Sequence, residues 1–155
     1  RHTRYISVTG VQTCALPILH LNTMKGESNL EILLKNMNPI LNIGEYVFCT
    51  TKKFNHVNKD CIINLFKEKE GYTLILKKED ADIYGFSYSS VMAWITLEVH
   101  SSLEAVGLTA AFSKQLADNM ISCNVIAGYY HDHIFIPIQK AEEALNLLDD
   151  LKNSK

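Results

Sequence analysis

Hydrophobic residues recur at helical spacing near the start of the regular part of the chain. Ser28 and Glu31 have the three-residue spacing of a capping box, in which each side chain bonds the backbone N–H of the other residue. Pro39, which cannot continue a helix, lies a short distance beyond. The spacing predicts a helix between these signals. Its apolar face consists of Leu30, Leu33, Leu34 and Met37.

The remainder of the first half alternates between apolar runs and polar turns. Residues 45–51 are rich in β-branched and aromatic side chains and predict a strand. Residues 61–66 form a short apolar run, and residues 72–76 follow a charged turn as another strand. The acidic segment 79–82 predicts a short helix or turn.

The second half has a more regular pattern. Residues 92–100 predict a strand, 101–109 a loop that turns into a helix near Gly107, and 123–129 and 133–138 the two strands of a hairpin. The two helices are marked by apolar stripes, Leu108, Ala111, Phe112, Leu116 and Met120 in one and Ala141, Leu145, Leu148 and Leu151 in the other. The order is strand, helix, strand, strand, helix. One strand from the first half would complete a β-α-β-β-α-β ferredoxin-like unit.

Composition narrows the class of protein. The chain has 155 residues, of which 47% are hydrophobic and 21% charged, enough for one compact domain or two small ones that share a core. No apolar run approaches the roughly 20 residues that cross a bilayer. A net charge of −2 gives no basic patch for nucleic acid or an anionic membrane. The four cysteines are widely spaced without a CxxC pair, so we expect free thiols in a reducing cytoplasm.

The first residues do not share this patterning. Residues 1–23 show neither the helical nor the strand repeat of hydrophobic residues for long. Gln12, Thr13 and Pro17 interrupt the apolar stretch that a signal peptide would need. The peptide VTGVQTCALPI, residues 8–18, resembles the in-frame translation of a sequencing-library adapter. We therefore interpret residues 1–23 as a non-native leader and expect the natural protein to begin at or near Met24.

A chain that starts at Met24 is expected to melt at the same temperature as the full chain, because the leader has no periodic apolar face to pack. Differential scanning calorimetry of both chains checks this. A loss of several degrees would show instead that the leader packs on the domain.

Two longer motifs of the second half, VHSSLEAVGLTA at residues 99–110 and NVIAGYYHDHIF at residues 124–135, resemble ACT domains. More narrowly, residues 28–151 resemble a small family of stand-alone bacterial proteins with two ACT domains in tandem. The resemblance implies an α+β fold of two ferredoxin-like ACT units that share strands. Residues 24–88 would form a degenerate N-terminal unit and residues 89–155 a C-terminal ACT domain.

The resemblance also implies a function. ACT domains bind amino acids or similar small effectors and commonly regulate enzymes to which they are fused. No catalytic domain is recognised in this chain, so the expected protein is a regulatory, amino-acid-sensing module without catalytic activity or cofactor, and its regulated partner is unknown. Open sheet edges favour side-by-side pairing into a homodimer.

The loop that leads into the first helix of the C-terminal unit is the main candidate site. A glycine there lets the backbone approach a ligand closely, and the unpaired N–H groups of a helix start suit a carboxylate. The alternative is that Gly107 only permits a turn and that Ser101 or Ser102 only caps it. The resemblance assigns the effector contact to Val106, Gly107, Leu108 and Thr109, and the predicted loop also includes His100, Ser101 and Ser102.

The resemblance adds a second group of candidate ligand-binding residues. Ser122 and Asn124 would start the strand that faces the loop, with Val125 and Ile126 supplying neighbouring atoms. The alternative is that Asn124 bonds a local turn, as asparagine often does.

Other chemistry is less well supported. His131, Asp132 and His133, with His100, suggest a metal-dependent enzyme. In a strand, however, His131 and His133 share one face and Asp132 points to the other, and no third ligand is fixed, so no metal is expected. Cys123 lies in an apolar strand without an activating base. A further alternative is a ligand-free module that uses the fold only to dimerise.

Overall fold

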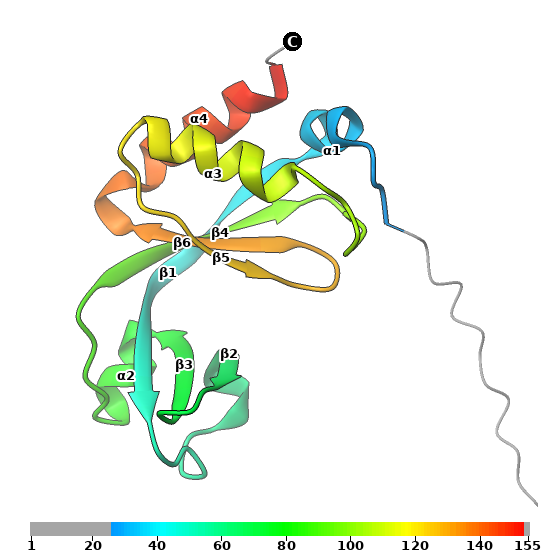
Figure 1. The fold of residues 1–155 in the computed structure, drawn as a ribbon. Coiled ribbons are helices and arrows are strands. Elements are labelled where there is room, and N and C mark those ends of the chain that lie inside the picture. Colours follow the sequence, from blue (N-terminus) through cyan, green and yellow to red (C-terminus); the bar gives the residue numbers. More distant parts are fainter. Residues whose placement is uncertain (1–25, 154–155) are drawn as a thin grey trace, which may run out of the picture.

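The computed structural model describes residues 26–153, so the interpreted leader lies outside the described residues. It is a mixed α+β fold in which helices pack against one six-stranded antiparallel sheet (Figure 1). None of the helices in residues 26–153 is long and apolar enough to cross a membrane. The elements are α1 (Leu30–Asn36), β1 (Asn38–Thr51), η1 (Lys59–Cys61), β2 (Ile62–Lys67), β3 (Tyr72–Lys77), α2 (Lys78–Ile83), β4 (Val91–Glu98), α3 (Leu108–Asp118), β5 (Asn124–Ala127), β6 (Asp132–Pro137), η2 (Ile138–Lys140) and α4 (Ala141–Asn153).

The strand order β2-β3-β1-β4-β6-β5 divides the sheet into two overlapping four-stranded units. The C-terminal unit comprises β4, α3, β5, β6 and α4, and β1 supplies its fourth strand by pairing with β4. The N-terminal unit comprises β1, β2, β3 and α2, and the start of β4 completes it. The predicted ferredoxin-like arrangement, with a strand contributed by the first half, is therefore confirmed.

The long strand β1 belongs to both units because it bends in the middle. Its pairing with β4 shifts register between Asn42 and Tyr46, and Gly44 lies there with a φ of +129°. Glycine adopts such a φ readily, whereas other residues are strained. The first part of β1 extends the upper unit in Figure 1, and the second part pairs with β3 in the lower one.

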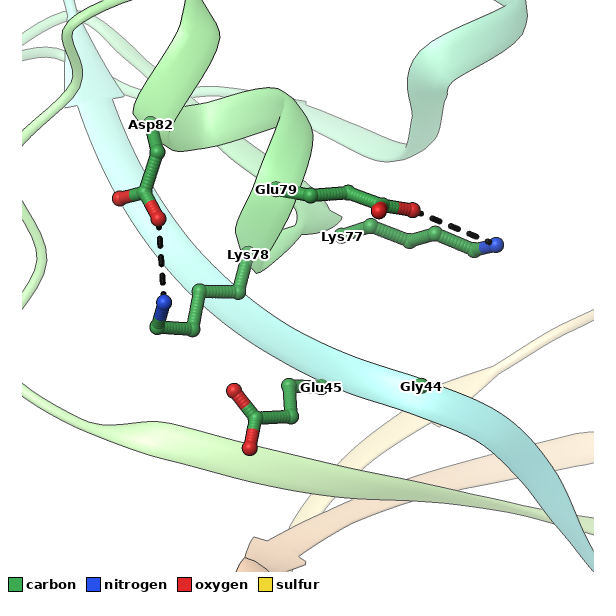
Figure 2. Close-up of a pocket in the computed structure, with 6 residues that line it drawn as sticks. All are labelled: Gly44, Glu45, Lys77, Lys78, Glu79 and Asp82. Atoms are coloured by element: carbon green, nitrogen blue, oxygen red, sulfur yellow. Dashed lines mark hydrogen bonds and ion pairs between the residues drawn. The ribbon is translucent and has the colours of Figure 1, made fainter.

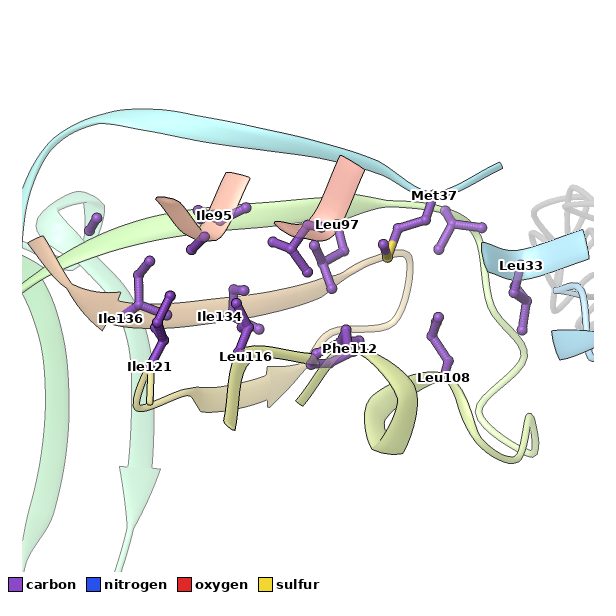
Figure 3. Close-up of a cluster of buried hydrophobic side chains, with 14 residues drawn as sticks. Leu33, Met37, Ile95, Leu97, Leu108, Phe112, Leu116, Ile121, Ile134 and Ile136 are labelled. Atoms are coloured by element: carbon purple, nitrogen blue, oxygen red, sulfur yellow. The ribbon is translucent and has the colours of Figure 1, made fainter. Parts of the chain in front are cut away.

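The core of the C-terminal unit lies between the sheet and the helices α1, α3 and α4. Ile95 and Leu97 of β4 face Phe112 and Leu116 of α3 in one buried cluster (Figure 3). Leu33 of α1 is fully buried in the same cluster. The division of the sequence after residue 88 stays a prediction, but the core of the second half already includes side chains from α1.

The N-terminal unit has a smaller core and only one α-helix of its own. Val47, Leu74 and Leu76 pack against Ala81 of the six-residue helix α2. The connection from β1 to β2 contains only the short 3-10 helix η1. A loop therefore takes the position of the first helix of this unit, as expected of a degenerate copy.

Three local expectations are corrected. Asn29, not Ser28, caps α1, because its side chain accepts the N–H groups of Glu31 and Ile32. The strand predicted to reach residue 100 ends at Glu98. Pro137, near the end of the predicted strand 133–138, would suit a sheet edge because proline has no N–H to donate to a neighbouring strand, but β6 is an interior strand. Pro137 is tolerated there because it is the last residue of β6 and β5 pairs only as far as Phe135.

Candidate functional site

The start of α3 has the geometry of an anion-binding helix terminus. Gly107 is the N-cap residue with a φ of +105°, and no side chain caps the helix. Leu108 is buried in the core, whereas Thr109 and Val106 are exposed. The backbone N–H groups of the first turn therefore face the surroundings without a capping side chain, with the partial positive charge of a helix start.

The first part of the predicted loop is already used by the chain itself. The Glu27 N–H donates to the His100 carbonyl at 2.9 Å, and the Ser102 N–H donates to the Glu27 carbonyl at 2.7 Å. The Ser102 hydroxyl accepts the Glu104 N–H, as in an ordinary turn. The backbone at residues 100–102 is thus held by the segment before α1, and the open part of the loop is 106–109.

The second predicted group lies elsewhere. Asn124 pairs with Phe135, which lies opposite Trp94 in the middle of β4, whereas the loop follows the far end of β4. Ser122 follows the end of α3, and a helix of 11 residues separates it from Gly107 by about 16 Å. The expectation that this strand start faces the loop is therefore wrong. The Asn124 amide instead donates to the Phe135 carbonyl at 3.1 Å.

A charged residue that was not among the predicted ligand contacts lies at the loop end of the sheet. Asp132 is the first residue of β6 and is only 7% exposed. It pairs with Leu97 near the end of β4, and alternation along β6 puts its side chain on the same face as Ile134, toward α3. Figure 3 shows Ile134 beside Leu116, with Leu108 further toward the start of α3.

Asp132 has an unusual electrostatic environment. Within residues 26–153 its carboxylate has no hydrogen-bond donor or salt-bridge partner. Burial raises the pKa of the Asp132 carboxyl, and nearby His131 opposes the increase. The carboxylate oxygens keep some contact with solvent, since the fully buried side-chain atom without a partner in residues 26–153 is His131 Nδ1. A carboxylate on a mostly buried side chain is nevertheless costly without a donor, and such groups are concentrated at functional sites. The sequence pattern predicted that Asp132 lies in the turn of the hairpin, so its burial was not expected.

The histidines flanking Asp132 do not form a metal site with it. His133 lies on the opposite face, where its Nδ1 accepts from Trp94 Nε1 at 3.2 Å and lies 3.1 Å from Thr96 Oγ1. Burial lowers the pKa of His133, with a smaller effect from His131. His131 Nδ1 is buried without a hydrogen-bond partner in the described structure. No group of three His, Cys, Asp or Glu side chains in residues 26–153 could hold a metal ion.

Two other features do not resemble a reactive or effector site. Burial raises the pKa of the Cys123 thiol to about 11, so it carries little of the reactive thiolate near neutral pH. A hollow of about 230 Å³ beside α2 is lined by charged side chains (Figure 2). Two lysines there already pair with acids, Lys78 with Asp82 at 3.0 Å and Lys77 with Glu79 at 3.9 Å.

Comparisons with known proteins agree with the fold. Two ACT domain profiles match in tandem, one over residues 25–93 and the other over residues 89–150. No curated protein matches the chain.

Among solved structures, a Vibrio cholerae protein of unknown function, described as a possible transport protein, is 49% identical, with 79% of this chain and 95% of that chain covered and a TM-score of 0.71. The regulatory subunit of aspartate kinase from Thermus flavus is 10% identical, with coverage of 73% and 95% and a TM-score of 0.52. Clostridium acetobutylicum aspartate kinase is 9% identical, with coverage of 76% and 34% and a TM-score of 0.53. The last two similarities concern the fold alone.

Proposed function

Because the chain belongs to the ACT domain family, we propose that it is a regulatory module that binds a small amino-acid effector between the start of α3 and Asp132. The observation that carries the proposal is the buried, unpaired carboxylate at the same end of the unit as an uncapped helix start. The effector carboxylate would accept the N–H groups of residues 108–110. Its ammonium group would donate to Asp132.

This arrangement favours a zwitterion over a simple acid or a simple amine. The helix start carries partial positive charge and Asp132 carries negative charge, so a ligand with both groups satisfies each end. A carboxylate alone would leave Asp132 without a partner, and an amine alone would leave the N–H groups of the helix without one. Binding that orders this end of the unit would shift a conformational or assembly equilibrium, which is how such a module regulates a partner.

Thermal denaturation in the presence of each of the twenty amino acids tests the proposal. An effector at 100 times its Kd should stabilise the protein by about 2.7 kcal/mol. The best amino acid is then compared with its decarboxylated amine and its deaminated acid. Both analogues should bind at least about tenfold more weakly, since each loses a charge-assisted hydrogen bond worth about 1.5–3 kcal/mol.

The same screen separates the alternatives. A module that only dimerises would show no stabilisation by any amino acid but a melting temperature that rises with protein concentration. An effector whose deaminated acid binds as tightly as the amino acid would place Asp132 outside the site.

A further inference from the structure

The helix-free face of the sheet borders a second cavity, on the side of the sheet opposite to α3. The cavity has a volume of about 590 Å³ and is lined by residues of β1, β2, β3 and β5. The edge strands β2 and β5, at opposite ends of the strand order, thus approach one another across this face. Figure 1 shows these two strands in separate units. The volume falls within the range of roughly 300–1,000 Å³ typical of small-molecule sites.

The base of this cavity is an aromatic and aliphatic cluster. Ile75 and Phe135 are almost fully buried although no helix covers this face, because Phe48 and Ile126 pack against them from the two units. The rings of Phe48 and Phe135 meet edge to face at 5.3 Å. Such a base suits a flat apolar group, which gains from both burial and ring contacts.

Polar groups lie on one side of the cavity only. Asn64, Glu68 and Thr73 line it from β2, β3 and the turn that joins them. The Thr73 hydroxyl donates to Glu68 Oε1 and so orients the carboxylate. No lysine, arginine or histidine in residues 26–153 forms a salt bridge with Glu68. The charge at the cavity is therefore negative and available to a cation.

We propose that this cavity binds a small organic cation, an amine with a flat apolar body that lies on Phe48 and Ile126 and directs its ammonium group toward Glu68. Phe66 of β2, 64% exposed, would cover the apolar body from the outer side. The site is separate from the proposed effector site. Its lining includes Val125 and Ile126, two of the residues predicted from the sequence to contact a ligand.

Three probes of one size test the ligand class: 2-phenylethylamine, the neutral 2-phenylethanol and the anion phenylacetate. Trp94, the only tryptophan in the chain, reports binding because its ring stacks on Phe135 at 5.9 Å within the cluster beneath the cavity. The amine should change Trp94 fluorescence at millimolar concentrations and bind about three- to tenfold more tightly than phenylethanol. Phenylacetate should bind most weakly.

Substitutions then locate the site. Glu68→Gln should remove the preference for the amine over phenylethanol, whereas Glu70→Gln, in the same turn but outside the cavity, should preserve it. Asn64→Phe, which fills the cavity from the edge strand β2 on the same face as Ile75, should abolish binding of all three probes. An amine that does not bind, or that binds equally to Asn64→Phe and the parent chain, would overturn the proposal. An amino-acid effector at α3 should still bind to Asn64→Phe, so failure at one site would not imply failure at the other.

Discussion

Replacing Asp132 with asparagine is expected to raise the melting temperature at neutral pH and to weaken effector binding. The stability effect follows from burial, which raises the pKa of the Asp132 carboxyl in the folded protein. Above the ordinary aspartate pKa of about 3.9 the unfolded chain is already ionised, and folding must then bury a charge. Asparagine has a similar shape without this cost. A gain of about 0.5–2 kcal/mol is the usual size of a single stabilising substitution.

The raised pKa of Asp132 also predicts how the free energy of unfolding changes with pH. A carboxyl group whose folded pKa is raised favours folding at acidic pH, and this contribution is lost as pH rises through the folded pKa. The parent chain should therefore gain stability relative to Asp132→Asn as pH falls from neutral toward 3.9, and the two curves should converge. Urea unfolding of both chains across this range measures the difference.

Asp118→Asn is the matched control, because Asp118 is an exposed aspartate at the other end of α3, paired with Lys114 at 2.5 Å. It should change neither the pH dependence nor effector binding. Binding should fall by at least about tenfold in Asp132→Asn, since a charge-assisted hydrogen bond is lost. An Asp132→Asn protein that is less stable at neutral pH and binds normally would assign this carboxylate a structural role.

Replacing Gly107 with valine is expected to destabilise the fold strongly, in addition to any loss of affinity for the effector. A residue other than glycine is strained at a φ of +105°, at a cost of about 1–3 kcal/mol. A Cβ atom there would also lie 2.9 Å from Leu30 Cδ2, so the side chain of α1 must move. The displaced atom is the end of a flexible side chain, so this contact adds less to the destabilisation than the backbone strain does. Gly107 therefore supports the packing of α1 as well as the helix start.

A double-mutant cycle separates the two causes. Gly107→Ala in the parent chain includes both strain and the contact with Leu30, whereas Gly107→Ala in a Leu30→Ala background includes mainly the strain. The second cost should be smaller, as measured by urea unfolding. An equal loss of unfolding free energy in both backgrounds would show that Leu30 moves aside without cost and that backbone strain accounts for the whole effect. Binding is then measured with Gly107→Ala rather than valine, at a temperature where the variant remains folded.

Much of the architecture follows from local pattern. The apolar stripes of α3 and α4 predicted both helices, and the hairpin around residues 128–131 follows from two apolar runs and a polar turn. The order of elements implied the β-α-β-β-α-β unit and a strand borrowed from the first half. These are properties of short segments, and the residues that decide them lie within a turn or two of each other.

The composition of the candidate site was predicted only in part. The loop was expected to lead into the first helix of the C-terminal unit and does so, but Ser122 and Asn124 were expected to face it and lie toward the other end of α3 instead. Their polar character says nothing about which end of the helix they approach. That depends on the direction in which β5 joins the sheet, and the pairing of Asn124 with Phe135 determines it.

The identity and order of the secondary-structure elements therefore follow from local sequence alone. The packing of α1 in the core of the second half, the participation of β1 in two units and the burial of Asp132 follow from contacts between distant segments. Alternation along β6 assigns Asp132 to a face of the sheet, but that face becomes a low-dielectric interior only once α3 covers it. Burial arises from contacts between segments distant in sequence, and so does the raised pKa that makes this carboxylate a candidate for recognition.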